Sequence, residues 1–182
     1  MPRAVTLALG GALAVETSDV IARALAARGV ECARAGGENA LEEALERAAG
    51  PESHLLVLVC ETDDDDEPPM EARAVVREIF RRAASGIATV GAFACACVGD
   101  NDARRERASW RCNQTTATDC NAVGLAVETA MRRGMGMRRV GDVLALDRSK
   151  EDEDAWARGE SARAETWAAD VARRWTEAAV AE

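Results

Sequence analysis

Short apolar runs alternate along the chain with longer stretches in which apolar residues recur at helical spacing. The short runs, several of them rich in leucine and valine, predict buried strands. Five strands are expected, at residues 4–9, 30–35, 54–60, 87–98 and 138–146. The run HLLVLVC at 54–60 gives the strongest signal, and the run at 87–98 is long enough to contain a bend at Gly91.

Each apolar run is followed by a stretch with helical periodicity and recognisable helix ends. Ser18 or Asp19 is expected to cap the first helix, and Gly29 to end it. Five helices are predicted, at residues 18–29, 37–50, 68–86, 121–134 and 160–182. In the last helix Trp167 and Trp175 share one face, which should pack against the sheet.

This alternation predicts an α/β fold with right-handed crossovers. The expected architecture is a doubly wound five-stranded parallel sheet in a three-layer α/β/α sandwich, and residues 1–182 form a single domain. Ligands of such sheets bind beyond the carboxyl ends of the strands. The candidate site loops are therefore residues 10–17, 60–69 and 99–119.

Composition and charge narrow the classes of function. The net charge of −9 argues against nucleic acid or an anionic membrane as the main partner. No run approaches the roughly 20 apolar residues of a spanning helix, so no membrane insertion is expected. The first apolar run begins at Ala4, which leaves no room for a secretory leader. A cytoplasmic location with reduced thiols follows, and a processed organellar chain is the alternative.

The segment CETDDDDEPP at 60–69 places four aspartates where a parallel sheet normally binds its ligand. Several carboxylates together suit Ca²⁺ or Mg²⁺. However, consecutive residues of an extended loop point in alternate directions, and no EF-hand spacing is present. We therefore expect the run Asp63 to Asp66 to be a solvated acidic loop rather than a metal site or a docking patch for an arginine-rich protein.

Four segments carry a resemblance to a known family. They are TSDVIARALAARG at 17–29, ETDDDDEPPMEA at 61–72, QTTATDCNAVG at 114–124 and ETWAADVARRW at 165–175. In the same order, the flavodoxin-like FMN domain of the diflavin reductases has its first helix, a loop S-T-Y-G-E-G-D-P-P-D-N-A, a loop N-x-T-Y-x-x-F-N-A-x-G, and a closing E-D-F-x-x-W-x-x-x-x-W. The chain resembles that domain nearly from end to end. This resemblance implies a flavodoxin-like fold.

The resemblance also implies where FMN would bind. The family positions fall on Leu13, Val15, Glu16, Thr17, Ser18, Thr62, Asp63, Asp64, Thr116 and Ala117. The family holds the FMN phosphate in a loop T/S-x-T-G-x-T, but here Glu16 replaces the glycine. A carboxylate a few ångström from a phosphate repels it by roughly 1–4 kcal/mol. Asp63 and Ala117 replace the two tyrosines that stack on the flavin ring, and Trp110 is the only aromatic that could cover one face.

We therefore expect a degenerate flavodoxin-like domain with no cofactor, which acts as a non-catalytic structural or interaction subunit of a larger assembly. The alternative is an FMN-binding electron-transfer protein that works with a separate reductase or acceptor. Both hypotheses require a protein partner, because no FAD or NADPH module fits in 182 residues. Contacts with that partner are expected at residues 103–113 and 148–159.

The cysteines and the single histidine are further candidates for a site. Cys95 and Cys97 lie two residues apart on a predicted strand, so they face the same side. A zinc or iron–sulfur site would recruit Cys60 and Cys112, but the spacing matches no C-x-x-C pattern. Buried small hydrophobic residues are the preferred interpretation, and no metal ligands are predicted. His54 precedes a strand at the end opposite to the ligand loops, so no catalytic role is expected.

Overall fold

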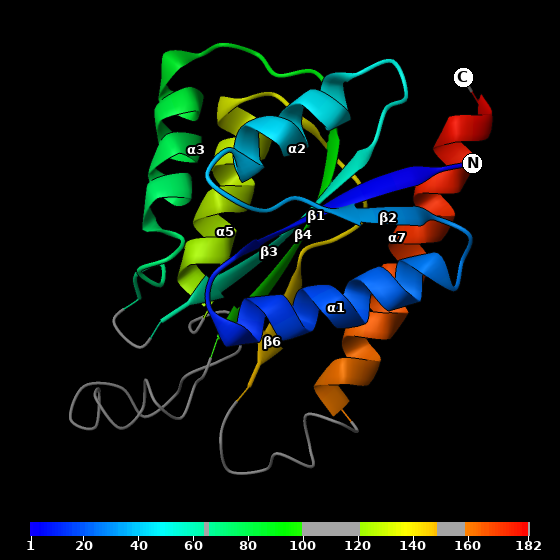
Figure 1. Cartoon of the computed structure of the whole chain (residues 1–182), viewed down its shortest axis with the longest axis horizontal. Helices are drawn as coiled ribbons and strands as arrows, with labels where there is room; N and C mark the ends of the chain where they lie inside the picture. Colours follow the sequence, from blue (N-terminus) through cyan, green and yellow to red (C-terminus); the bar gives the residue numbers. More distant parts are fainter. Residues whose placement is uncertain (64–65, 100–120, 149–158, 182) are drawn as a thin grey trace.

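The computed structural model describes residues 1–63, 66–99, 121–148 and 159–181. The strands are β1 (Arg3–Leu9), β2 (Glu31–Arg34), β3 (Leu55–Thr62), β4 (Ala92–Gly99), β5 (Arg138–Arg139) and β6 (Leu144–Asp147). The helices are α1 (Ala12–Ala26), α2 (Ala40–Ala49), α3 (Arg73–Ser85), α5 (Ala122–Thr129), the π-helical turn η2 (Ala130–Gly134) and α7 (Ser161–Ala181). Figure 1 shows them around one central sheet.

All strand pairs are parallel, in the order β2-β1-β3-β4-β5, and β6 also pairs with β4. The predicted parallel α/β fold is therefore confirmed. The predicted fifth strand at 138–146 is two short strands, because Gly141 turns the backbone between them with a φ of 74°. Both short strands lie along the same edge of β4.

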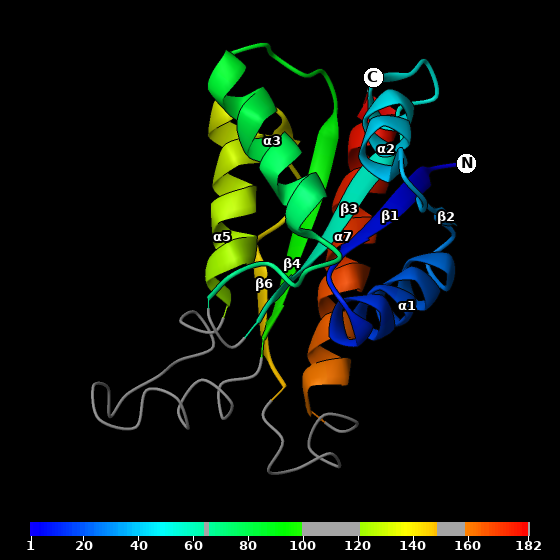
Figure 2. The same ribbon diagram turned by 60° about the vertical axis from the view of Figure 1, so that its left-hand side comes forward.

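Helices cover both faces of the sheet, as the three-layer prediction requires. Figure 2 shows α3 and α5 on one side and α1 and α7 on the other. The core is divided in the same way, because alternate residues of β3 point to opposite faces. Leu56, Leu58 and Cys60 pack with α2, α3 and α5. Leu55, Val57 and Val59 pack with α1 and α7.

The predicted start of the first helix was wrong. Helix α1 begins at Ala12 with Gly11 as its N-cap, so Ser18 is a buried residue inside the helix and not a cap. The predicted loop at 10–17 shrinks to Gly10 and Gly11. Helix α1 thus begins earlier than predicted, whereas helix α3 begins later, at Arg73. The predicted bend in the fourth strand run is confirmed, since Gly91 has a φ of 137° and β4 begins at the next residue.

The tryptophans of α7 hold this helix on the sheet, as predicted. Trp175 is 6% exposed, and its indole N–H donates a hydrogen bond to the carbonyl of Arg3 at 3.1 Å. The indole N–H of Trp167 donates to the carbonyl of Asp142 at 2.7 Å. Among the described helices, none combines the length and the apolar character that crossing a bilayer requires.

Candidate functional site

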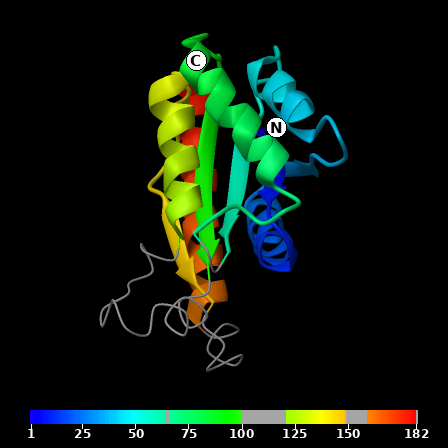
Figure 3. The same ribbon diagram turned by 90° about the vertical axis from the view of Figure 1, so that its left-hand side faces the viewer.

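The carboxyl ends of β1, β3, β4 and β6 lie at one end of the parallel sheet, where the predicted ligand loops begin. Figure 3 shows this end of the sheet at the lower end of the molecule. The N-termini of α1 and α5 reach the same end of the sheet, where both are bound by residues at the end of β3. At this end of the sheet, the N-termini of both helices present backbone N–H groups, which suit an anionic ligand.

Two consecutive residues at the end of β3 bind these two helix N-termini. Oε2 of Glu61 accepts a hydrogen bond from the backbone N–H of Ala14 at 3.0 Å, and the backbone N–H of Gly11 also lowers the pKa of this carboxyl. On the other face of the sheet, Oγ1 of Thr62 accepts a hydrogen bond from the N–H of Val123 in α5 at 3.2 Å. Both helices are therefore capped by side chains of β3.

The two glycines after β1 let the Glu61 side chain come close to the backbone. A Cβ atom added to Gly10 would lie 2.4 Å from Cβ and 2.7 Å from Oε2 of Glu61. A Cβ atom added to Gly11 would lie 3.7 Å from both carboxylate oxygens. Glycine at position 10 is therefore required by Glu61, since any side chain there would displace it.

The surroundings of Glu61 shift its acidity in opposite directions. Burial raises the pKa of the Glu61 carboxyl, whereas the hydrogen bonds from Ala14 and Gly11 lower it. The carboxylate of Glu71 raises the pKa further, and Arg148 lowers it. The net shift is upward. Glu61 therefore holds its negative charge at some electrostatic cost, which a second anion at the same place would increase.

The charge of Glu16 is neutralised by an ion pair. Its Oε2 lies 2.7 Å from Nη1 of Arg148, whose side chain is only 15% exposed. The sequence predicted that the carboxylate of Glu16 would repel a phosphate. In the structure this carboxylate is paired with Arg148, which directly follows β6. The anionic group at the start of α1 is Glu61 instead.

The structure places the other implied FMN positions as follows. Leu13, Val15, Glu16, Thr17 and Ser18 all belong to α1, Thr62 ends β3, and Asp63 follows it. Asp64, Trp110, Thr116 and Ala117 lie outside the described residues. The hydroxyls of Thr17 and Ser18 are fully buried and have no hydrogen-bond partner in the described part of the chain. They face the interior, so they are not available to an anion at the edge.

Sequence reasoning missed Glu61, Gly10 and Gly11. The signal that could have revealed them was the pair of glycines directly after the first strand, because such a pair permits close approach of another group to the backbone. Glu61 was interpreted as the beginning of an acidic loop. It is instead part of β3, which continues to Thr62.

The described part of the acidic loop is a hydrogen-bonded turn. Oδ1 of Asp63 accepts a hydrogen bond from the N–H of Glu67 at 3.0 Å, and Oδ2 lies 3.7 Å from the guanidinium of Arg73. Asp66 adopts a left-handed conformation with a φ of 63°. Across residues 1–63, 66–99, 121–148 and 159–181, no group of three or more His, Cys, Asp or Glu side chains is arranged to hold a metal ion.

Among the described residues, the buried thiols of Cys60, Cys95 and Cys97 lie together beneath α5. Cys60 and Cys97 are directly paired in the sheet, and Cys95 belongs to the same cluster, which confirms that Cys95 and Cys97 share a face. Hydrogen bonding to Cys95 and burial raise the pKa of both Cys60 and Cys97. These thiols are free and buried, as predicted. His54 precedes β3 at the end opposite to Glu61, also as predicted.

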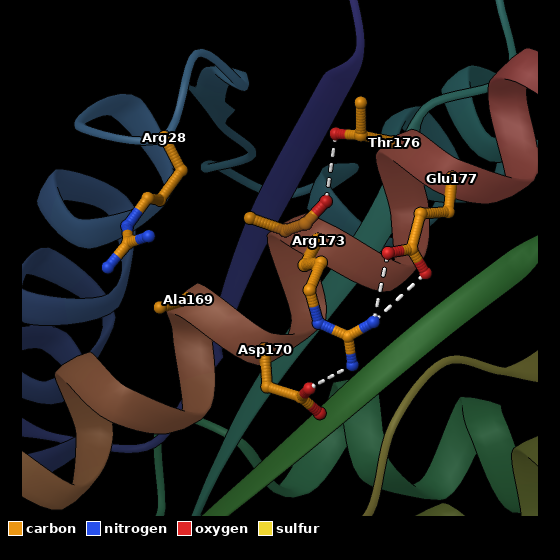
Figure 4. A pocket seen from close by; sticks show the side chains of 7 residues that line it. Arg28, Ala169, Asp170, Arg173, Thr176 and Glu177 are labelled. Carbon is orange, nitrogen blue, oxygen red and sulfur yellow. Dashed lines mark hydrogen bonds and ion pairs between the residues drawn. The ribbon is translucent and has the colours of Figure 1, made fainter.

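A shallow groove of about 540 Å³ lies elsewhere, between the C-terminal part of α7 and the residues that follow α1. Figure 4 shows Arg28, Asp170, Arg173 and Glu177 around it. Arg173 is held by Asp170 at 2.7 Å and by Glu177 at 3.0 Å. Because most of its charges neutralise one another, this groove offers no set of groups for catalysis.

Comparison with known proteins places this geometry in a fold family. A flavodoxin cysteine-to-alanine mutant from Pseudomonas aeruginosa superposes with a TM-score of 0.62 at 18% identity, covering 97% of this chain and 99% of that one. The chain has a flavodoxin-like fold. A short-chain flavodoxin associated with a non-canonical PDU bacterial microcompartment gives a TM-score of 0.63 at 12% identity, covering 95% of this chain and 98% of that one.

A flavodoxin-like domain from a Synechococcus sp. protein is similar as well, with a TM-score of 0.51 at 14% identity and coverage of 96% and 99%. No protein-family model matches the sequence, and no curated protein matches it. At these identities the comparison shows the fold, and the chemistry has to be argued from the site.

Proposed function

We propose that this flavodoxin-like chain does not use FMN and serves as a non-catalytic interaction subunit of a larger assembly. The observation that carries this proposal is the Glu61 carboxylate at the N-terminus of α1. The resemblance in sequence implies that FMN phosphate would bind at this helix end. An anion supplied by the protein already occupies the N–H donors there.

The phosphate of FMN does not fit the described residues. To bind, it would have to displace Glu61 from Gly11 and Ala14 or share these donors with it. Two anions a few ångström apart repel by about 1–4 kcal/mol, and each lost hydrogen bond to a charged group adds about 1.5–3 kcal/mol. The first turn of α1, from Ala12 to Val15, contains no hydroxyl that could compensate.

Exposed apolar side chains support a role in protein contact. Phe80 in α3 is 41% exposed, and Ile87 and Val90 in the following loop are 71% and 76% exposed. Large exposed apolar patches are typical of interaction surfaces, and Ile87 and Val90 place two exposed apolar side chains in one short loop. One protein of similar structure is itself associated with a microcompartment, which is a protein assembly of the kind that this proposal requires.

FMN-dependent electron transfer, with a separate reductase or acceptor, is the second candidate. Its support is the likeness of the whole chain to flavodoxins in fold. The two functions differ in one measurable property, which is the retention of flavin by the wild-type protein.

The decisive experiment is incubation of the purified chain with excess FMN, followed by desalting and a visible absorption spectrum. We expect no flavin band, because the phosphate cannot replace Glu61. A flavodoxin treated in the same way provides the positive control. Retention of about one FMN per chain would overturn the proposal and favour electron transfer.

The interaction role is tested on the protein from its native source. We expect it to elute from size-exclusion chromatography together with a partner at constant stoichiometry. The double variant Ile87→Asp/Val90→Asp should lose this co-elution and keep the thermal stability of the wild type, since both side chains are exposed. Elution of the native protein as a lone 19.3 kDa chain would contradict the proposal.

A further inference from the structure

We propose that the exposed side of α3 and the loop after it form a docking surface for an acidic segment of a partner protein that also carries apolar side chains. The inference rests on the proposed function, since it names the chemistry of the partner that an interaction subunit requires. We call this region the arginine surface, and its members are Arg77, Phe80, Arg81, Ile87, Val90 and Arg133. Figure 1 shows the loop after α3 at the top of the molecule, at the end of the sheet opposite to the candidate site.

Two close contacts bring the parts of the arginine surface together. Ala83 of α3 packs so tightly on η2 that a Cβ atom added to Gly134 would lie 2.4 Å from Cβ of Ala83. The N–H of Thr89 donates a hydrogen bond to the carbonyl of Met135 at 2.8 Å. The end of η2 therefore lies beside the end of α3 and beside the loop that follows it.

The arginine surface combines apolar side chains with guanidinium groups. Arg77, Phe80 and Arg81 are exposed and share one face of α3, since residues three and four positions apart on a helix are neighbours. Ile87 and Val90 extend the apolar part beyond the end of the helix and are exposed as well. Aromatic residues and arginine are the residues enriched at the centres of protein interfaces.

The charge of this region is opposite to that of the chain as a whole. The chain carries a net charge of −9, but residues 73–99 contain four arginines and one glutamate, and residues 129–141 contain four arginines and no acid. Among the described residues, Arg77 and Arg133 have no ion-pair partner. Both guanidinium groups are therefore available to carboxylates of another protein.

The carboxylates nearby do not balance these arginines, because single carboxylates serve two of them. Oε1 of Glu78 lies 2.6 Å from Arg81 and 2.8 Å from Arg82. Glu128 is shared in the same way by one arginine of η2 and one of β5. An excess of positive charge remains on this side of the molecule.

The extent of the arginine surface favours a protein segment over a larger polyanion. It is bordered by the acidic helix α2, whose Glu42 lies 3.1 Å from Arg82. A bilayer or a nucleic acid extends beyond the arginine surface and would meet the other acidic residues of the chain, which repel it. A peptide segment is small enough to stay on the surface. Its carboxylates pair with the guanidinium groups, and its apolar side chains cover those of the loop at 87–90.

The test measures binding of a fluorescein-labelled helical peptide by fluorescence anisotropy. The peptide contains leucine, alanine and glutamate, with the leucines along one face and the glutamates beside them. We expect saturable binding to the wild-type chain, weakened at least about tenfold when NaCl rises from about 50 mM to about 300 mM, because salt screens exposed charges. A peptide with lysine in place of glutamate should not bind. Absence of saturable binding, or equal binding of both peptides, would overturn the inference.

The double variant Arg77→Glu/Arg133→Glu tests the location. It should bind the peptide at least about tenfold more weakly than the wild type and keep its melting temperature, since it breaks no ion pair among the described residues. The matched control Arg23→Glu/Arg28→Glu makes the same change of charge at two exposed residues in and after α1, on the other face of the sheet. It should bind within about twofold of the wild type. Equal losses would show that net charge, and not the arginine surface, decides binding, and would overturn the inference.

The variant Ile87→Ser/Val90→Ser tests the apolar part without changing the charge. It should bind the peptide at least about fivefold more weakly and keep the salt dependence of the wild type, since it loses only apolar surface that binding would bury. Unchanged binding would overturn the inference, because the surface would then attract any acidic chain by charge alone.

Other occupants are distinguished with the same variants. The wild-type chain should neither sediment with vesicles of equal parts phosphatidylserine and phosphatidylcholine nor self-associate in analytical ultracentrifugation. Either event, if abolished by Arg77→Glu/Arg133→Glu, would overturn the inference in favour of a membrane or of a second copy of the chain. The proposed function fails separately, when the native protein elutes alone or the wild type retains FMN. A native partner that stays bound to Arg77→Glu/Arg133→Glu would leave the proposed function intact and overturn this inference.

Discussion

Glu61 and Thr62 are consecutive residues of β3, and their side chains bind the N-termini of two helices on opposite faces of the sheet. The carboxylate of Glu61 reaches α1, and the hydroxyl of Thr62 reaches α5. Strand geometry explains the division, because successive side chains of a strand point to opposite faces. One dipeptide thus connects the central strand to both outer layers at the edge where this fold would bind a ligand.

Replacement of Thr62 by valine should destabilise the protein by about 0.5–2 kcal/mol, the usual range for loss of an N-terminal helix cap. Valine keeps the shape of threonine but removes the acceptor for the Val123 N–H, in a position that is 4% exposed. Urea denaturation measures the change. Thr62→Ser retains the hydroxyl and is the control. If Thr62→Val were as stable as the wild type, the hydrogen bond to Val123 would not be the reason for the cap.

Acidification from pH 8 towards pH 5 should stabilise the wild type relative to Glu61→Gln. The folded state raises the pKa of Glu61, so it binds the proton more tightly than the unfolded state does. The resulting contribution to the free energy of unfolding is fully present below the unfolded pKa. It is lost as the pH rises through the folded pKa. Urea titrations of both proteins at several pH values report the difference, and a constant difference across this range would contradict a raised pKa.

The order of the elements could be predicted from the sequence because each strand is a compact apolar run and each helix repeats its apolar residues every three to four positions. The end of α3 at Gly86 and the bend at Gly91 could also be predicted, since both rest on the ability of glycine to adopt a positive φ. The start of α1 could not be found in this way. The side chain that binds its first turn is Glu61, which lies 47 residues away from Ala14 in the sequence.

The carboxylate that binds the start of α1 is Glu61 and not Glu16, which the sequence did not reveal. Glu16 occupies the position of the glycine in the family's phosphate loop. It pairs with Arg148, which directly follows β6 and is distant from Glu16 in the sequence. The role of Glu61 could be predicted only if the end of β3 were known. Because β3 continues to Thr62, the side chain of Glu61 points to the face of the sheet that α1 covers. Such long-range contacts leave no local pattern in the sequence.

Replacement of Glu128 by glutamine should lower the free energy of unfolding by about 1–3 kcal/mol, since hydrogen bonds to charged groups are the stronger ones. Glu128 is 5% exposed, and its Oε1 lies 2.6 Å from Arg132 and 2.8 Å from Arg139. Although burial opposes it, hydrogen bonds from both arginines lower the pKa of Glu128. Its contribution is therefore present above the unfolded pKa and is lost as the pH falls through the folded pKa.

The control for Glu128 is an ion pair of similar chemistry in solvent. Glu177 pairs with Arg173 at 3.0 Å, but its side chain is 62% exposed. Exposed pairs contribute little because water screens both charges. Glu177→Gln should therefore denature at the urea concentration of the wild type. If both variants lost equal stability, burial would not be the reason for the effect of Glu128.

Replacement of Gly124 by alanine should destabilise the protein by about 1–3 kcal/mol through overpacking of the thiol cluster. A Cβ atom at this position would lie 2.3 Å from Sγ and 2.8 Å from Cβ of Cys97. Cys97→Ala removes the closer atom, so the double variant should lose less stability than the sum of the two single losses. Additive losses in a urea-based double-mutant cycle would contradict this contact. Gly36→Ala, where nothing lies within 4 Å, should leave stability unchanged.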